Sequence, residues 1–112
     1  MKLLKSMFVA SLSEAAISEI SNGCGPKGAW IDIVPDDFFG LDIAPACDIH
    51  DAEYSLNDDR FEADLNFLNN MVILNHEDKG ESDTTKLLRL NIIMKYFTAV
   101  YFGGEKAFKE GK

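Results

Sequence analysis

The chain has 112 residues, of which 46% are hydrophobic and 27% are charged, and these values are typical of one globular domain over residues 1–112. The net charge is −8, and residues 23–82 carry 14 acidic side chains against 3 basic ones. This negative charge argues against a nucleic-acid-binding surface and disfavours adsorption to strongly anionic membranes. The sequence contains no apolar run of about 18 residues, so no integral membrane segment is predicted.

The first twenty or so residues begin with a short apolar stretch flanked by lysines, which could be interpreted as a signal peptide. The apolar run stops at Ser11 and lacks a convincing cleavage site of small residues, which disfavours that interpretation. Apolar residues recur at helical spacing from Leu4 through Phe8 and Leu12 to Ile20. We expect one amphipathic N-terminal helix, and the compartment stays open: cytoplasmic, or released without a clear signal peptide.

Residues 21–42 are irregular and hold four of the eight glycines and two of the three prolines. Residues 31–34 could form a short extended piece that ends at Pro35. The 29–42 part of this loop also carries aromatic side chains, and we assign it no role from the sequence. These aromatic residues belong either to the core or to an exposed apolar rim suited to a lipid interface: Trp30, Phe38 and Phe39.

Two helices are predicted next, and their short connection favours an antiparallel pair. The first begins near Pro45, a residue tolerated only in a first turn, and runs to about Leu56. The second covers about residues 60–75, because Asp59 followed three residues later by Glu62 is a capping-box-like start. Its inner stripe is expected to consist of apolar residues at helical spacing: Phe61, Leu65, Leu68 and Val72.

A polar loop follows, and His76 beside it is interpreted as an ordinary surface residue. Ser82 or Asp83 can cap a last long helix that is closed by Gly103 and Gly104. The aromatic-rich sequence of this helix is typical of core packing. The predicted fold class is therefore mainly α.

The chemistry-bearing residues lie in the helix predicted over residues 45–56. Cys47, His50 and Tyr54 share one face by their spacing of three and four residues, whereas Asp51 follows about 100° around the helix. The side chains of His50 and Asp51 can therefore contact different groups, such as a water at His50 and a cation at Asp51. A lone His-Asp pair is more often structural than catalytic, so this pair needs support from elsewhere in the chain.

Asp64 supplies that support, because it falls within the apolar stripe of the next helix. A buried carboxylate is costly unless it is paired. In an antiparallel pair of helices its natural partner is His50, which would then keep its second ring nitrogen for use as a base. The alternative is that Asp64 is a helix-face acid paired with a lysine or arginine.

The two cysteines, Cys24 and Cys47, are too few for a disulfide scaffold, and their separation matches no zinc-ligand pattern. In a reducing cytosol they would remain thiols, and in an oxidising compartment they could form one bridge. Such a bridge would tie the glycine-rich turn of residues 22–28 to the helix that carries His50.

Taken together in order, these segments resemble the phospholipase A2 superfamily. The resemblance rests on Gly-Cys-Gly-Pro at residues 23–26, Cys-x-x-His-Asp-x-x-Tyr at residues 47–54 and the pair Ala63-Asp64. It is strongest to short bacterial and phage members with an Asn-Gly-Cys-Gly-Pro loop and a Phe-Leu-Asn-Asn-Met string, here residues 67–71. It covers roughly residues 22–72.

The resemblance implies a phospholipase A2-like fold, with two antiparallel central helices, a calcium-binding loop and flanking N- and C-terminal helices. It also implies a Ca²⁺ site formed by the backbone carbonyls of Gly23, Gly25 and Lys27 and by the Asp51 carboxylate. Ligation by oxygen alone is what this hard cation prefers. In the secreted members of the superfamily, the positions that match Cys24 and Cys47 are joined by a disulfide.

The same resemblance implies a catalytic apparatus. His50 would be the general base, Asp64 its orienting partner, Tyr54 a hydrogen-bond donor to Asp64, and the Gly25 amide would face the developing oxyanion. The implied activity is Ca²⁺-dependent hydrolysis of phospholipid acyl esters at a membrane interface. The alternative is a non-catalytic binding or structural module of the same fold, for example a phage-associated one. The chain departs from the secreted enzymes in having at most one disulfide and a longer stretch between its cysteines.

Overall fold

The computed structural model describes residues 3–20 and 39–110. Its elements are α1 (Met7–Ala10), α2 (Glu14–Ile20), α3 (Ala44–Leu56), α4 (Arg60–Glu77), α5 (Asp83–Gly103) and α6 (Glu105–Glu110). These ranges contain no strand, so the prediction of a mainly α fold is confirmed for them. No helix in the same ranges is long and apolar enough to cross a membrane. The extended piece predicted at residues 31–34 lies outside the described residues.

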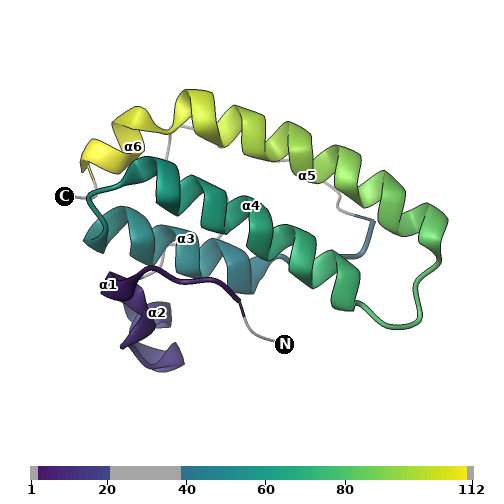
Figure 1. The fold of residues 1–112 in the computed structure, drawn as a ribbon, viewed down its shortest axis with the longest axis horizontal. Helices are drawn as coiled ribbons and strands as arrows, with labels where there is room; N and C mark the ends of the chain where they lie inside the picture. Colours follow the sequence, from purple (N-terminus) through teal and green to yellow (C-terminus); the bar gives the residue numbers. More distant parts are fainter. Residues whose placement is uncertain (1–2, 21–38, 111–112) are drawn as a thin grey trace.

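The helices α3, α4 and α5 lie side by side and run in alternating directions (Figure 1). The antiparallel arrangement predicted for the two central helices is therefore present as α3 and α4. The main core fills the space between these three helices, with Cys47 and Tyr54 from α3, Phe67 and Met71 from α4, and Ile93 among the residues from α5. This packing brings the chemistry-bearing face of α3 against α4.

The connection between α3 and α4 is built from local hydrogen bonds. The Asp59 side chain accepts from the amide nitrogen of Glu62 at 3.1 Å, as expected of an N-cap. The reciprocal half of the predicted capping box is absent, because the Asp59 amide donates to Asn57 Oδ1 at 2.9 Å. Glu62 instead accepts from the Asn57 side chain at 2.8 Å. Asn57 thus joins the end of α3 to the start of α4.

The long helix α5 begins as predicted, because the Ser82 hydroxyl accepts from the amide of Thr85 at 3.1 Å. The helix ends at Gly103, but Gly104 has a φ of −86° and is not the left-handed cap that the glycine pair suggested. The chain can therefore continue directly into α6, a short helix that the sequence pattern did not predict. Through α6, Phe108 packs at the edge of the Tyr54 ring.

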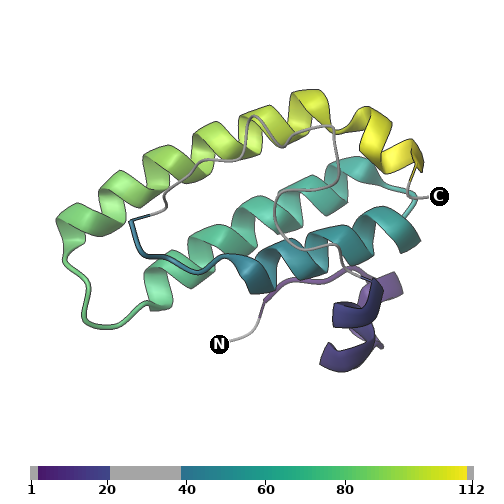
Figure 2. The same cartoon turned by 180° about the vertical axis from the view of Figure 1, so that it is seen from behind.

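The prediction of one amphipathic N-terminal helix is wrong. The segment forms two short helices, and the Ser13 hydroxyl accepts from the amide of Ala16 to start the second one. Val9 and Ile17 are the buried residues, whereas the predicted stripe from Leu4 to Ile20 is largely exposed. Both helices pack on the side of α3 that faces away from α5 (Figure 2).

The predicted inner stripe of α4 is only partly correct, because Leu68 and Val72 pack against the main core but Phe61 does not. Phe61 is 56% exposed, and the other predicted positions are only half-buried. The buried face is rotated from them and includes polar residues: Ala63, Asp64, Phe67, Asn70, Met71 and Asn75. The physical reason is that each buried polar side chain finds partners on another segment, so burial is not governed by hydrophobicity alone.

Asn70 and Arg89 show how such partners hold the surrounding chain. Asn70 accepts from the backbone nitrogen of Leu4 at 2.6 Å and donates to its carbonyl oxygen at 2.9 Å, which fixes the N-terminal segment on α4. Arg89, almost fully buried in α5, donates to the carbonyl oxygen of Phe39 at 2.7 Å and to Asp78 at 2.6 Å. Phe39 itself is exposed and has a φ of 53°, a strained value for an aromatic residue, which the Arg89 bonds offset.

Candidate active site

The helix α3 places Cys47, His50 and Tyr54 on one buried face, as their spacing predicted. His50 is only 5% exposed, and Asp51, next along the helix, is half-buried. Cys47 is disulfide-bonded in the structure. Cys24, the only other cysteine in the sequence, lies outside the described residues.

Asp64 on α4 is fully buried opposite this face. Its Oδ1 lies 2.8 Å from His50 Nε2 and accepts from the Tyr54 hydroxyl at 2.7 Å. The predicted hydrogen bond between His50 and Asp64 is therefore present, and so is the Tyr54 contact that the resemblance implied. The Asp64 Oδ2 accepts from Arg60 Nη1 at 3.0 Å, so the alternative pairing with an arginine also occurs, on the other carboxylate oxygen.

The His50 ring is held by aromatic neighbours as well as by Asp64. It stacks on Phe67 with ring centroids 4.3 Å apart and lies 4.3 Å from the Tyr54 ring. Since an ionised carboxylate only accepts hydrogen bonds, Nε2 carries the proton that it shares with Asp64. The other ring nitrogen of His50 is Nδ1. This is the arrangement that orients a histidine as a general base.

Tyr54 is a permanent donor in this arrangement. Burial raises the pKa of its phenol far above the ordinary value, and the adjacent negative charge of Asp64 raises the pKa further. The hydroxyl therefore remains protonated throughout the range in which a histidine titrates. Tyr54 can steady the Asp64 carboxylate, but it cannot compete with His50 for a proton.

Arg60 and Glu53 are two charged residues with buried partners that the sequence patterns did not single out. Arg60 could have been found from its position one turn before Asp64, the spacing of an ion pair on a helix. Glu53 is fully buried on α3, and its carboxylate accepts from the backbone nitrogen of Ser6 at 2.7 Å and from the Ser6 hydroxyl. Asn57 and Asn66 also donate to it, at 3.1 and 3.4 Å. No local sequence pattern predicts that a glutamate will be buried in this way.

A Ca²⁺ ion is implied by the resemblance, and the chemistry of the proposed donors fits it. Asp51 offers a half-buried carboxylate next to the candidate base, and the remaining ligands would be backbone carbonyls, so every donor is oxygen. The predicted positions Gly23, Gly25 and Lys27 lie outside the described residues. Within residues 3–20 and 39–110, no three His, Cys, Asp or Glu side chains form a group that could hold a metal.

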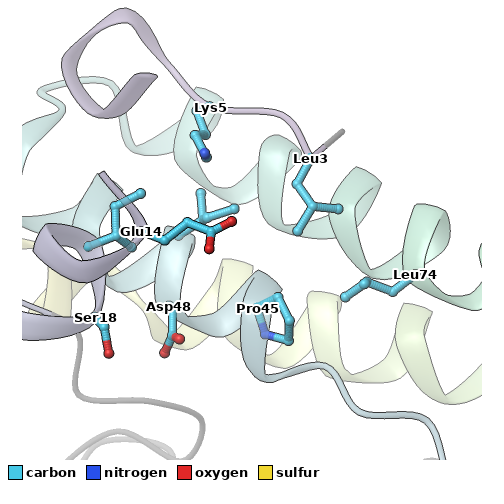
Figure 3. Close-up of a pocket in the computed structure, with 9 residues that line it drawn as sticks. Leu3, Lys5, Glu14, Ser18, Pro45, Asp48 and Leu74 are labelled. Atoms are coloured by element: carbon cyan, nitrogen blue, oxygen red, sulfur yellow. The ribbon is translucent and has the colours of Figure 1, made fainter. Parts of the chain in front are cut away.

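A cavity of about 630 Å³ lies between the N-terminal segment and the start of α3. Figure 3 shows Lys5 and Glu14 reaching toward it from the N-terminal segment, and Asp48 and Pro45 from α3. Asp48 and Pro45 are on a different face of α3 from His50, which is not among the lining residues. The cavity and the His50–Asp64 pair are therefore separate features of the described structure.

Comparisons with protein-family models, with curated proteins and with solved structures found no match for this chain. The features of the chain that indicate a function are its sequence motifs and the geometry around Asp64.

Proposed function

We propose that this protein is a phospholipase A2-like hydrolase that cleaves acyl esters of phospholipids in a Ca²⁺-dependent reaction. The observation that carries the proposal is the hydrogen bond of 2.8 Å between His50 Nε2 and the buried Asp64. It joins two residues that match the catalytic pair of the superfamily and lie 14 positions apart on different helices. A purely structural role for these residues would not require the histidine base.

In the proposed reaction, His50 Nδ1 takes a proton from a water molecule, and the water oxygen forms a bond to the ester carbonyl carbon. The bond between that carbon and the alcohol oxygen then breaks, and His50 returns the proton to the leaving alkoxide. Asp64 holds the imidazole orientation through both steps, and Tyr54 and Arg60 hold Asp64. The products are a fatty acid and a lysophospholipid.

The metal would be held by Asp51 and by the backbone carbonyls of Gly23, Gly25 and Lys27. When bound there, Ca²⁺ would polarise the ester carbonyl as a Lewis acid. The amide of Gly25 would donate a hydrogen bond to the oxyanion, as the resemblance implies. These roles are carried over from the motif, and the described part of the structure contributes Asp51 to them.

A lipid interface is the proposed partner because apolar side chains of the N-terminal segment remain exposed. Met7 is 82% exposed, and Phe8 and Leu4 are exposed by nearly half. Side chains of this kind can insert into the boundary between headgroups and acyl chains.

The test is the release of fatty acid from mixed phospholipid vesicles by the purified protein, with Ca²⁺ and then with excess chelator. We expect release that stops on chelation. A protein that binds these vesicles but releases no fatty acid at millimolar Ca²⁺ would instead be the non-catalytic module.

Asp51→Asn tests the metal site separately. In the wild type, Ca²⁺ at one hundred times its dissociation constant should stabilise the fold by about 2.7 kcal/mol. The Asn variant should lose this Ca²⁺-dependent rise in melting temperature while its helical circular dichroism stays unchanged. A wild-type protein that shows no calorimetric binding of Ca²⁺ would reject the metal site.

A further inference from the structure

The cavity between the N-terminal segment and α3 has the size of a ligand site. Its volume of about 630 Å³ lies within the roughly 300–1,000 Å³ of typical small-molecule pockets. The lining residues come from the N-terminal segment, from α2, from the first half of α3 and from the last turns of α4. Neither His50 nor Asp64 lines it, so a ligand bound here would occupy a second site.

Most of the lining of this cavity is apolar. Ile17 of α2 and Ile49 of α3 are almost fully buried, at 4% and 5% exposure. In Figure 3, Leu3, Pro45 and Leu74 lie together at one end of the cavity. An alkyl chain laid against these side chains would be removed from water together with them, and this burial is the usual source of affinity for such a ligand.

The other end of the cavity carries charges of both signs. In Figure 3, Lys5 reaches it from the N-terminal segment, and Glu14 and Asp48 reach it from α2 and α3. Glu14 and Ser18 are four residues apart, so both oxygen-bearing side chains lie on one face of α2. Lys5 and Glu14, both in the described part of the chain, form no ion pair with each other. Opposite charges that reach one cavity without pairing suit a ligand that carries both signs.

We propose that this cavity binds one molecule of a zwitterionic single-chain amphiphile, whose headgroup contains a phosphate and a terminal ammonium group. The phosphate would pair with the Lys5 ammonium, and the ligand ammonium would pair with the Glu14 carboxylate. The alkyl chain would lie against Leu3 and Leu74 at the apolar end. A lysophospholipid has this chemistry and is also a product of the proposed hydrolysis, but the inference does not rest on that function.

The charge balance of the lining separates this ligand from other single-chain amphiphiles. The cavity is lined by two carboxylates and one ammonium group, so its charge is negative by one. A fatty acid or an alkyl phosphate would therefore add repulsion, and an alkyl ammonium would bring a second positive charge to Lys5. A zwitterion pairs with both signs, and specificity of this kind depends as much on avoided repulsion as on attraction.

The experiment measures the binding of dodecylphosphocholine by titration calorimetry, below its critical micelle concentration and without Ca²⁺. This probe contains no ester, so the outcome does not depend on hydrolysis. We expect tighter binding than for three probes with the same chain: dodecyl phosphate, dodecyltrimethylammonium and dodecyl maltoside. Absence of dodecylphosphocholine binding would overturn the proposal, and equal affinity for all four probes would overturn the role of the charges.

Two variants test the charges one at a time. Lys5→Gln should weaken dodecylphosphocholine binding about threefold to fivefold, as expected of one charge contact at a partly exposed site, and should strengthen dodecyltrimethylammonium binding. Glu14→Gln should weaken both and strengthen dodecyl phosphate binding. Opposite changes for two probes in one variant cannot come from a loss of folding.

The matched controls are Glu19→Gln, on the same short helix as Glu14, and Lys95→Gln on α5. Both residues are exposed, and neither lines the cavity. All four affinities should stay at the wild-type values in these controls. Equal changes in Glu14→Gln and Glu19→Gln would overturn the assignment of Glu14.

NMR locates the bound probe. The methyl resonances of Ile17 and Ile49 should shift on addition of dodecylphosphocholine, whereas those of the exposed Leu87 and Met94 on α5 should not. Equal shifts at all four residues would indicate general detergent adsorption and overturn the cavity site. A protein that binds the probe as expected but releases no fatty acid from vesicles with Ca²⁺ would reject the proposed function and retain this site. Hydrolysis without binding of the probe would do the reverse.

Discussion

Two fully buried carboxylates lie on neighbouring helices, Asp64 on α4 and Glu53 on α3, and their partners differ in kind. Asp64 accepts from a histidine, a tyrosine and an arginine, whereas Glu53 accepts from a serine, two asparagines and a backbone amide. The Glu53 partners carry no group that titrates in the physiological range, and through Ser6 they hold the N-terminal segment on α3. The Asp64 cluster contains a group that can gain and lose a proton. Burial of a carboxylate alone therefore does not indicate a catalytic role. The indication comes from the chemistry of the groups that donate hydrogen bonds to it.

The largest expected effect that separates the two clusters is on the rate of hydrolysis. His50→Gln should lower kcat by at least the 10²- to 10⁴-fold typical of general-base catalysis, because the ring nitrogen that takes the proton is lost. The matched control is His76→Gln, which changes the exposed histidine and should leave kcat unchanged. Initial rates on phospholipid vesicles check both. Retained activity in His50→Gln would contradict the assignment of the base.

The second-largest expected effect is a loss of stability, and it concerns the cluster around Glu53. Glu53→Ala should lower the free energy of unfolding by about 3 kcal/mol, since it removes a charged acceptor and leaves buried donors unsatisfied. Denaturant unfolding measures this change. A fully folded Glu53→Ala protein should retain hydrolysis under conditions where it remains native. A loss of kcat as large as that of His50→Gln would show that the two clusters are not functionally separate.

A smaller loss of stability is expected at the second anchor of the N-terminal segment. Asn70→Ala removes two hydrogen bonds to Leu4 and should cost about 2 kcal/mol, at roughly 1 kcal/mol for each bond. Hydrogen exchange at the Leu4 amide should become faster while amides in the middle of α4 stay protected. Uniformly faster exchange in α4 would indicate that Asn70 supports the helix itself and not the attached segment.

The smallest effect concerns Tyr54 and has a defined pH dependence. Tyr54→Phe should cost about 1 kcal/mol at neutral pH, because one hydrogen bond to Asp64 is lost. In the wild type, burial raises the folded pKa of Tyr54 above the unfolded value of about 10. The folded state therefore holds its proton longer, and this contribution to stability is complete below about pH 10 and is lost as the pH rises further. Unfolding measured between neutral and strongly alkaline pH should show a shallower decline in Tyr54→Phe than in the wild type.

Several features of the candidate site could be predicted from the sequence because they depend on local spacing. The distance along the chain from Cys47 through His50 to Tyr54 puts these residues on one helical face wherever the helix packs. The choice of His50 as partner for Asp64 needed only a short connection between two helices. Arg60 was missed although its spacing from Asp64 is equally local, because an exposed ion pair and a buried one look alike in sequence.

The N-terminal segment shows where local pattern fails. Apolar residues from Leu4 to Ile20 have helical spacing, yet Ser13 starts a new helix, and Val9 and Ile17 are the residues that become buried. Each such aliphatic side chain contributes about 1.5–3 kcal/mol when buried, so the contact with α3 outweighs the preference for one continuous helix. The burial of polar side chains on α4 is also decided by contacts with other segments. Hydrogen-bond partners from these distant segments compensate the free-energy cost of removing the polar groups from water.

The sequence by itself determined the three long helices α3, α4 and α5, the caps at Asp59 and Ser82, and the common face of His50 and Tyr54, since each follows from interactions within a few residues. Only the tertiary structure decided that Glu53 is also buried and which groups surround it. Asp64 and Glu53 are both acidic residues on helices, but the sequence pattern predicted a partner for Asp64 alone. The packing of α3 against α4 brings Asp64 to His50, and the return of the N-terminal segment brings Ser6 to Glu53. A buried charge takes its chemistry from such neighbours, because in a site of low dielectric their hydrogen bonds and charges replace water.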